Sequence, residues 1–155
     1  MRVSGKVRIL LLVLTLSSVL GLANVVFCEE LILNDLAFKP VNLSALSGKP
    51  HILLFWTTWC PYCRAELKAL NKMYPQMEKE GVAVFAVNVA EARYKVERFF
   101  KDSALNLRVL LDTDGLAAEK YEIRGVPTYI FINRSGGVVS TEHNLQPDYK
   151  SLLSR

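Results

Sequence analysis

Two cysteines, Cys60 and Cys63, stand where the character of the sequence changes. Before them, residues 51–57 (HILLFWT) form a short and mostly apolar run, which predicts a strand buried on both faces. After them, residues 61–80 carry apolar side chains three and four positions apart, the spacing of a helix with one buried face. A cysteine pair at this junction restricts the chain to folds in which a central strand leads directly into a helix.

The rest of the chain continues this alternation of strands and helices. Further elements are predicted as a buried strand at 82–89, a helix at 92–101, a strand at 107–111, a short helix ending near Tyr121, a hairpin of 129–133 with 138–141, and a last short helix opening at Pro147. Helices between strands imply parallel pairing, and the hairpin adds an antiparallel edge. We therefore predict an α/β fold: a central mixed sheet with helices on both faces, and short N-terminal strands within residues 31–46 at one edge.

Two residues are expected to shape the helix after the cysteines. Pro75 should kink or split it, because proline lacks the N–H that the helix needs. Gly81 should end it, because glycine readily adopts a positive φ.

The N-terminus predicts export from the cytoplasm. Residues 9–28 are 20 residues without a charge, and they follow a basic segment. A small-x-small pattern ends at Ala23, so residues 1–28 are predicted to be either a signal peptide or an uncleaved membrane anchor formed by residues 9–27. Both alternatives place the domain at 29–155 outside the cytoplasm. Cys28 as a lipid-carrying cysteine is disfavoured, because Phe27 stands where a small residue is usual.

The charge balance argues against a nucleic-acid partner. Arg2, Lys6 and Arg8 precede the apolar run, and removing them from the 19 basic residues leaves 16 against 15 acidic residues. A nearly neutral domain lacks the positive surface that binds phosphate backbones. Membrane contact is therefore expected only through the N-terminal segment.

The cysteine pair has the chemistry of disulfide exchange. With Pro61 at the first helical position, Cys60 lies beside unpaired backbone N–H groups, which favour the thiolate. Cys63 follows one turn later, close enough to form a disulfide, so we expect Cys60 to attack and Cys63 to resolve, as an exposed, reactive pair. A permanent structural disulfide is the first alternative. Half of a zinc site is the second, but His51 and His143 lack ligand spacing, so no metal is predicted.

The segment Trp56-Thr-Thr-Trp59-Cys60-Pro-Tyr-Cys63-Arg-Ala-Glu66 resembles the active site of the thioredoxin superfamily. More narrowly, it is similar to the extracytoplasmic TlpA/ResA-like thiol-disulfide oxidoreductases, including those that serve cytochrome c maturation. The resemblance covers about residues 31–142 and closes with Arg124-Gly-Val-Pro-Thr128. The 63 residues between Cys63 and Pro127 leave room for an extra strand–helix insertion, which resembles this subgroup more than minimal thioredoxin.

The resemblance implies a thioredoxin-like fold and roles for particular residues. Pro127 would be a cis proline facing the cysteines, which would turn the Val126 backbone toward an extended substrate. Glu66 matches an acid of this subgroup and could shuttle the proton of Cys63; the alternative is a solvated charge paired with a lysine or arginine. Trp59, Pro61 and Tyr62 would flank the sulfurs and contribute to substrate binding.

The predicted function is that of a monomeric thiol-disulfide oxidoreductase in the bacterial periplasm or cell envelope. The resemblance implies reduction of protein disulfides, with electrons from a membrane thiol-disulfide relay and no cofactor beyond the Cys60–Cys63 disulfide itself. Two other functions remain open. A peroxiredoxin-like peroxidase would use Thr57, three residues before Cys60, although Leu53 stands where that pattern has proline. A non-catalytic periplasmic peptide-binding or assembly factor would use Tyr62 and the Val126–Pro127 backbone.

Overall fold

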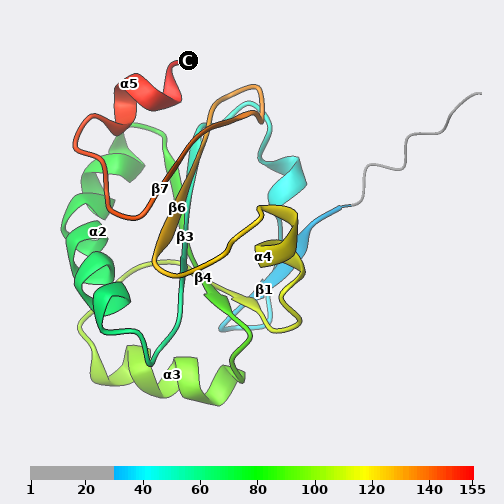
Figure 1. Ribbon diagram of the computed structural model, residues 1–155, viewed down its shortest axis with the longest axis vertical. Coiled ribbons are helices and arrows are strands. Elements are labelled where there is room, and N and C mark those ends of the chain that lie inside the picture. Colours follow the sequence, from blue (N-terminus) through cyan, green and yellow to red (C-terminus); the bar gives the residue numbers. More distant parts are fainter. Residues whose placement is uncertain (1–29) are drawn as a thin grey trace, which may run out of the picture.

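The computed structural model describes residues 30–155 (Figure 1). The predicted signal peptide or membrane anchor and Cys28 lie outside the described residues. Within residues 30–155, no helix combines the length and apolar character needed to cross a membrane.

The described residues form one seven-stranded mixed sheet with the order β2-β1-β5-β4-β3-β6-β7. Its strands are β1 (Ile32–Asp35), β2 (Pro40–Asn42), β3 (His51–Trp56), β4 (Ala83–Val89), β5 (Val109–Asp112), β6 (Thr128–Ile132) and β7 (Val138–Glu142). The helices are η1 (Leu43–Leu46), α2 (Pro61–Lys79), α3 (Arg93–Asp102), α4 (Leu116–Lys120) and α5 (Tyr149–Leu153). Pairing is parallel between β3 and β4 and between β4 and β5, and antiparallel elsewhere, including the predicted hairpin of β6 and β7.

Helices cover both faces of the sheet, as predicted (Figure 1). All six residues of β3 are buried, and the five from Ile52 to Trp56 alternate between two hydrophobic cores. Ile52, Leu54 and Trp56 belong to the core that packs against α2, α3 and α5. Leu53 and Phe55 belong to the core on the side of η1 and α4. From Ile52 to Trp56 the central strand is therefore apolar at every position because each face is covered.

The helix α2 continues through Pro75, so the expectation that it would split there is wrong. Pro75 lies on the exposed side of α2, while Tyr74 and Met77 are buried against the sheet. The lost backbone hydrogen bond therefore faces water, and packing on the other side holds the helix together. Gly81 ends the helical segment with a φ of 77°, as predicted.

The topology brings three segments to one edge of the sheet. Because β3 and β4 are parallel, the loops that follow Trp56 and Val89 leave from the same edge. Because β6 is antiparallel to β3, with Phe55 opposite Thr128, the segment entering β6 arrives there as well. The 63 residues between Cys63 and Pro127 include β4–α3 and β5–α4, in agreement with the predicted strand–helix insertion. The cysteine loop and the segment before β6 therefore face each other.

Candidate active site

Cys60 caps the N-terminus of α2. Its backbone is extended, with φ −81° and ψ 113°, and Pro61 begins the helix behind it. The Cys63 backbone N–H donates a hydrogen bond to Cys60 Sγ over 3.2 Å. Both cysteines are free thiols in this structure. The helix N-terminus thus directs a backbone N–H at Cys60 Sγ, the position expected for the attacking sulfur.

The two sulfurs are more buried than predicted. Only 4% of Cys60 and none of Cys63 is exposed, whereas Trp59 and Tyr62 are 69% and 76% exposed. Cys63 lies on the inward face of α2 with Leu67 and belongs to the main core, and the Val126 carbonyl lies 3.7 Å from Cys60 Sγ. The expectation of an exposed pair is therefore wrong. The exposed surface beside the cysteines is formed by the aromatic side chains of Trp59 and Tyr62.

Burial makes Cys63 a weak acid. Desolvation, and next a hydrogen bond with Cys60, raises the pKa of Cys63 to about 12. At neutral pH Cys63 therefore carries its proton while Cys60 stands at the helix N-terminus. This asymmetry fits the predicted division between an attacking and a resolving thiol.

The Val126–Pro127 peptide bond is cis, as the resemblance implied. The Cys60 thiol donates a weak hydrogen bond of 3.7 Å to the Val126 carbonyl. His143, a residue that the sequence analysis did not assign to the site, places Nδ1 3.0 Å from the Pro127 carbonyl oxygen and 3.3 Å from Thr128 Oγ1. The structure therefore brings the predicted Cys60, Val126 and Pro127 together and adds an imidazole behind them.

Glu66 is partly buried below the cysteines, with partners that the sequence did not indicate. Its Oε2 accepts hydrogen bonds from the Tyr129 hydroxyl and from the Leu145 backbone N–H, each of 3.0 Å. Within residues 30–155 it forms no ion pair with a lysine or arginine, so that alternative is wrong. Burial first, then the charge of Glu66 and its hydrogen bond, and then the charge of Cys63, raise the pKa of Tyr129 far above its ordinary value. Tyr129 therefore keeps its hydroxyl hydrogen and donates it to Glu66.

A second carboxylate, Glu91, holds the loop that leads to Cys60. It accepts hydrogen bonds of 2.6 Å from both the backbone N–H and the hydroxyl of Thr58, and one of 2.8 Å from Asn88 Nδ2. Only 9% of Glu91 is exposed. Burial raises the pKa of Glu91, but the hydrogen bonds from Thr58 and Asn88 outweigh burial, so its pKa is lowered. The sequence signal is an acid two residues after a buried parallel strand, at the edge where such strands end.

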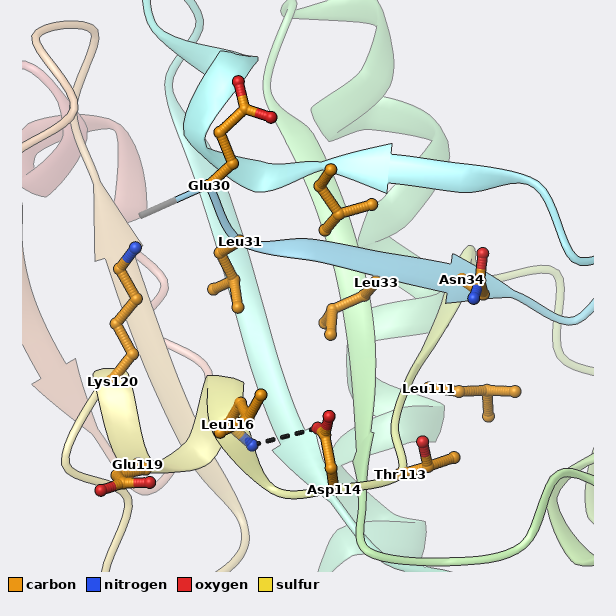
Figure 2. A pocket seen from close by; sticks show the side chains of 11 residues that line it. Glu30, Leu31, Leu33, Asn34, Leu111, Thr113, Asp114, Leu116, Glu119 and Lys120 are labelled. Atoms are coloured by element: carbon orange, nitrogen blue, oxygen red, sulfur yellow. Dashed lines mark hydrogen bonds between the residues drawn. The ribbon is translucent and has the colours of Figure 1, made fainter. Parts of the chain in front are cut away.

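Other features lie apart from the cysteines. Among residues 30–155, no group of three or more histidine, cysteine, aspartate or glutamate side chains could hold a metal ion. A hollow of about 660 Å³ lies between β1 and α4, where Leu31, Leu33 and Leu116 line it together with Asp114 and Lys120 (Figure 2). It contains none of the predicted site residues.

Comparison with known proteins agrees with this geometry. Residues 27–141 match the AhpC/TSA family. The thiol-disulfide oxidoreductase ResA of Bacillus subtilis is 35% identical over 127 residues, which cover 79% of this chain and 71% of that protein. ResA of Geobacillus kaustophilus is 34% identical over 109 residues, 70% of this chain and 63% of that protein. The crystal structure of a putative thiol:disulfide interchange protein DsbE from Chlorobium tepidum has a TM-score of 0.69 and 27% identity, and covers 79% of this chain and 87% of that one.

The fold, the paired cysteines and these similarities define a thioredoxin-like thiol-disulfide oxidoreductase of the ResA and DsbE type. The chain belongs to the AhpC/TSA family.

Proposed function

We propose that this chain reduces disulfides in protein substrates of the bacterial cell envelope through Cys60 and Cys63. One observation carries the proposal: Cys60 Sγ accepts the Cys63 N–H at a helix N-terminus and lies beside the Val126 carbonyl, while the Cys63 thiol is buried beneath it. The attacking sulfur, its resolving partner and a backbone acceptor for the substrate thus lie at one edge of the sheet.

The exchange proceeds in two steps. The Cys60 thiolate attacks one sulfur of a substrate disulfide, so a Cys60–substrate disulfide forms and the first substrate thiolate leaves. Cys63 then loses its proton and attacks Cys60, which forms the Cys60–Cys63 disulfide and releases the second substrate thiolate. The substrate gains two electrons and two protons, and the cysteine pair loses the same number.

The substrate meets the chain on the surface around the sulfurs. Trp59, Pro61 and Tyr62 surround Cys60 on the α2 side, and all three are exposed or partly exposed to solvent. Val126 and Pro127 face Cys60 from the entry to β6, where the Val126 backbone can pair with an extended peptide. These five residues form the proposed substrate-binding surface.

The direction of electron flow and the location extend the proposal. The N-terminal segment would export the domain or anchor it by residues 9–27, which places the cysteines in an oxidising compartment. A reductase there must be recharged, and we propose a membrane thiol-disulfide relay as the electron donor. The resemblance to proteins of cytochrome c maturation makes apocytochrome c the first substrate to try.

A redox titration of the cysteine pair tests the direction. The chain is equilibrated with dithiothreitol or glutathione buffers, the thiols are trapped, and the oxidised fraction is measured by mass. If the chain is a reductase, the reduction potential of the Cys60–Cys63 pair should lie nearer to about −270 mV, as in thioredoxin, than to about −120 mV, as in the oxidant DsbA. A potential near the second value would overturn the reductase assignment and leave disulfide exchange intact.

Glu66 is proposed to accept the proton of Cys63 during the second step. Glu66→Gln keeps the shape of the side chain but removes the base, so we expect the mixed disulfide to resolve about tenfold more slowly near neutral pH, with a weaker pH dependence. The measurement is stopped-flow decay of a preformed Cys60–peptide disulfide between pH 5 and 9.

Tyr129→Phe is the matched variant, because it removes the hydroxyl that binds Glu66 and leaves the carboxylate in place. It should retain most of the resolution rate and its pH dependence. If Glu66→Gln resolves at the native rate with the native pH profile, Glu66 has no part in proton transfer.

A further inference from the structure

A second hollow, of about 540 Å³, lies along the side of α2 that faces α3. Arg64, Lys68 and Lys72 line it from α2. Phe99 and Leu105 line it from α3 and the segment that follows, together with Asp102. None of the residues assigned above to catalysis or substrate binding takes part, so this groove is a separate feature of the surface.

The basic side chains form a single row. Arg64, Lys68 and Lys72 are four residues apart, so they lie on one face of the helix and span about 12 Å along its axis. All three are exposed, and none forms an ion pair with another part of residues 30–155. The row is therefore a positive surface not neutralised by ion pairing within the described chain.

Apolar surface lies beside this row. Phe99 and Leu105 are only partly buried where they pack against the main core. The Arg64 guanidinium lies 5.8 Å from the centre of the Phe99 ring. Three basic side chains outnumber the one carboxylate of the lining, Asp102, so the groove favours a ligand with net negative charge and apolar side chains, as in an acidic peptide segment.

One end of the groove reaches the active-site loop. The Arg64 guanidinium donates two hydrogen bonds, of 3.1 and 2.9 Å, to the Thr58 carbonyl in the loop before Cys60. Arg64 also directly follows Cys63 in α2. The row from Arg64 to Lys72 begins about 6 Å from Cys60 along the helix axis and ends at about 18 Å, which an extended chain covers in roughly two to six residues.

We propose that this groove docks an acidic, partly apolar segment of the protein substrate, two to six residues from its reacting cysteine. The inference rests on the function proposed above and specifies the substrate class: proteins with aspartate or glutamate close to the disulfide. The basic row of Arg64, Lys68 and Lys72 attracts and binds this acidic segment while the substrate disulfide reacts with Cys60.

The test compares two synthetic disulfide peptides that differ only near the cysteine. One carries four acidic residues and a leucine at positions two to six, and the other has glutamine in place of the acids. The full chain in detergent, reduced in advance, is mixed with each peptide, and the second-order rate of reduction is measured at low and high salt. Lys68→Glu/Lys72→Glu should lower the rate for the acidic peptide at least about tenfold and change the rate for the neutral peptide by less than about twofold. In high salt, this difference between the two peptides should disappear.

The matched control is Lys49→Glu/Lys79→Glu, which changes the net charge equally at the opposite end of the sheet. It should leave the rates for both peptides near their native values. The docking proposal would be overturned if both double variants reduced the acidic peptide equally slowly. It would also be overturned if the native chain reduced the two peptides at equal rates. Binding to anionic vesicles that depends on Lys68 and Lys72, without peptide selectivity, would instead assign the row to a membrane surface and overturn the proposal. Failure of the native chain to reduce either peptide would reject the proposed function itself.

Discussion

Replacing Cys60 by serine is expected to abolish disulfide exchange, with a loss of at least about a thousandfold in the rate of protein-disulfide reduction. Serine keeps the helix cap but cannot form a disulfide with a substrate, and the Cys63 thiol is buried with a pKa of about 12. Cys63 therefore cannot take over the attack at neutral pH. Reduction of insulin or of a fluorescent peptide disulfide measures the effect.

Cys63→Ser should have the complementary effect and trap substrates. Cys60 still attacks, but the mixed disulfide has no resolving thiol, so adducts that dithiothreitol reverses should accumulate in cell-envelope extracts. Cys28→Ser is the matched control, since it removes the third cysteine and should leave exchange unchanged.

The same variants separate the alternative functions. A peptide-binding factor would retain binding without either cysteine and would show no exchange. A peroxidase would consume peroxide through Cys60 faster than it reduces protein disulfides. Either result would replace the proposed reductase.

Loss of Glu91 is expected to destabilise the fold, although Glu91 does not react itself. Glu91→Ala leaves the Thr58 N–H and the Asn88 amide without their acceptor in a buried place, so the free energy of unfolding should fall by about 2–4 kcal/mol. Exchange should also slow, because the loop that positions Cys60 loses its anchor. Urea denaturation and the peptide assay measure the two effects.

Glu97→Ala is the control for the Glu91 variant. Glu97 pairs with Arg93 one turn away on the partly exposed side of α3, and its loss should cost less than about 0.5 kcal/mol. A Glu91→Ala protein as stable as the native chain would show that Thr58 and Asn88 find other partners.

The lowered pKa of Glu91 also gives a pH dependence with a defined sign. A carboxyl group whose pKa is lower in the folded protein stabilises the fold above its unfolded pKa of about 4.3. This contribution disappears as the pH falls from about 4.3 toward the folded value. The acid-unfolding curve of Glu91→Gln should therefore be shallower in this range than that of the native protein.

The central part of the fold could be predicted from the sequence because local patterns and tertiary environment agree there. The run before Cys60 is apolar from Ile52 to Trp56, as in a strand covered on both faces. The segment after it has helical spacing, and of the five apolar residues expected on its inward side four are buried (Leu67, Leu70, Tyr74 and Met77). The fifth, Met73, is 37% exposed. Pro75 was the exception, because the side of the helix on which a proline lies depends on packing that a local pattern does not contain.

The site was predicted only where residues are neighbours in the chain or form a known motif. Cys60, Cys63 and Val126–Pro127 fall in this group. Tyr129 lies in an apolar run typical of a buried strand. Its hydrogen bond with Glu66 joins residues 63 positions apart, which no local pattern indicates. Glu91 and Thr58 are 33 positions apart, and only the parallel pairing of β3 and β4 brings them together. The burial of the cysteines likewise depends on the segment before β6, which lies far along the chain.

The hydrogen bond from the Cys60 thiol to the Val126 carbonyl exists only while Cys60 is protonated. While Cys60 keeps its hydrogen, the thiol occupies the same acceptor that an incoming strand would use. When Cys60 loses its proton, the S–H donor is gone, the Val126 carbonyl no longer has this hydrogen bond, and the sulfur is a nucleophilic thiolate. Loss of this one proton would thus activate the nucleophile and free the Val126 carbonyl for a backbone N–H of the substrate.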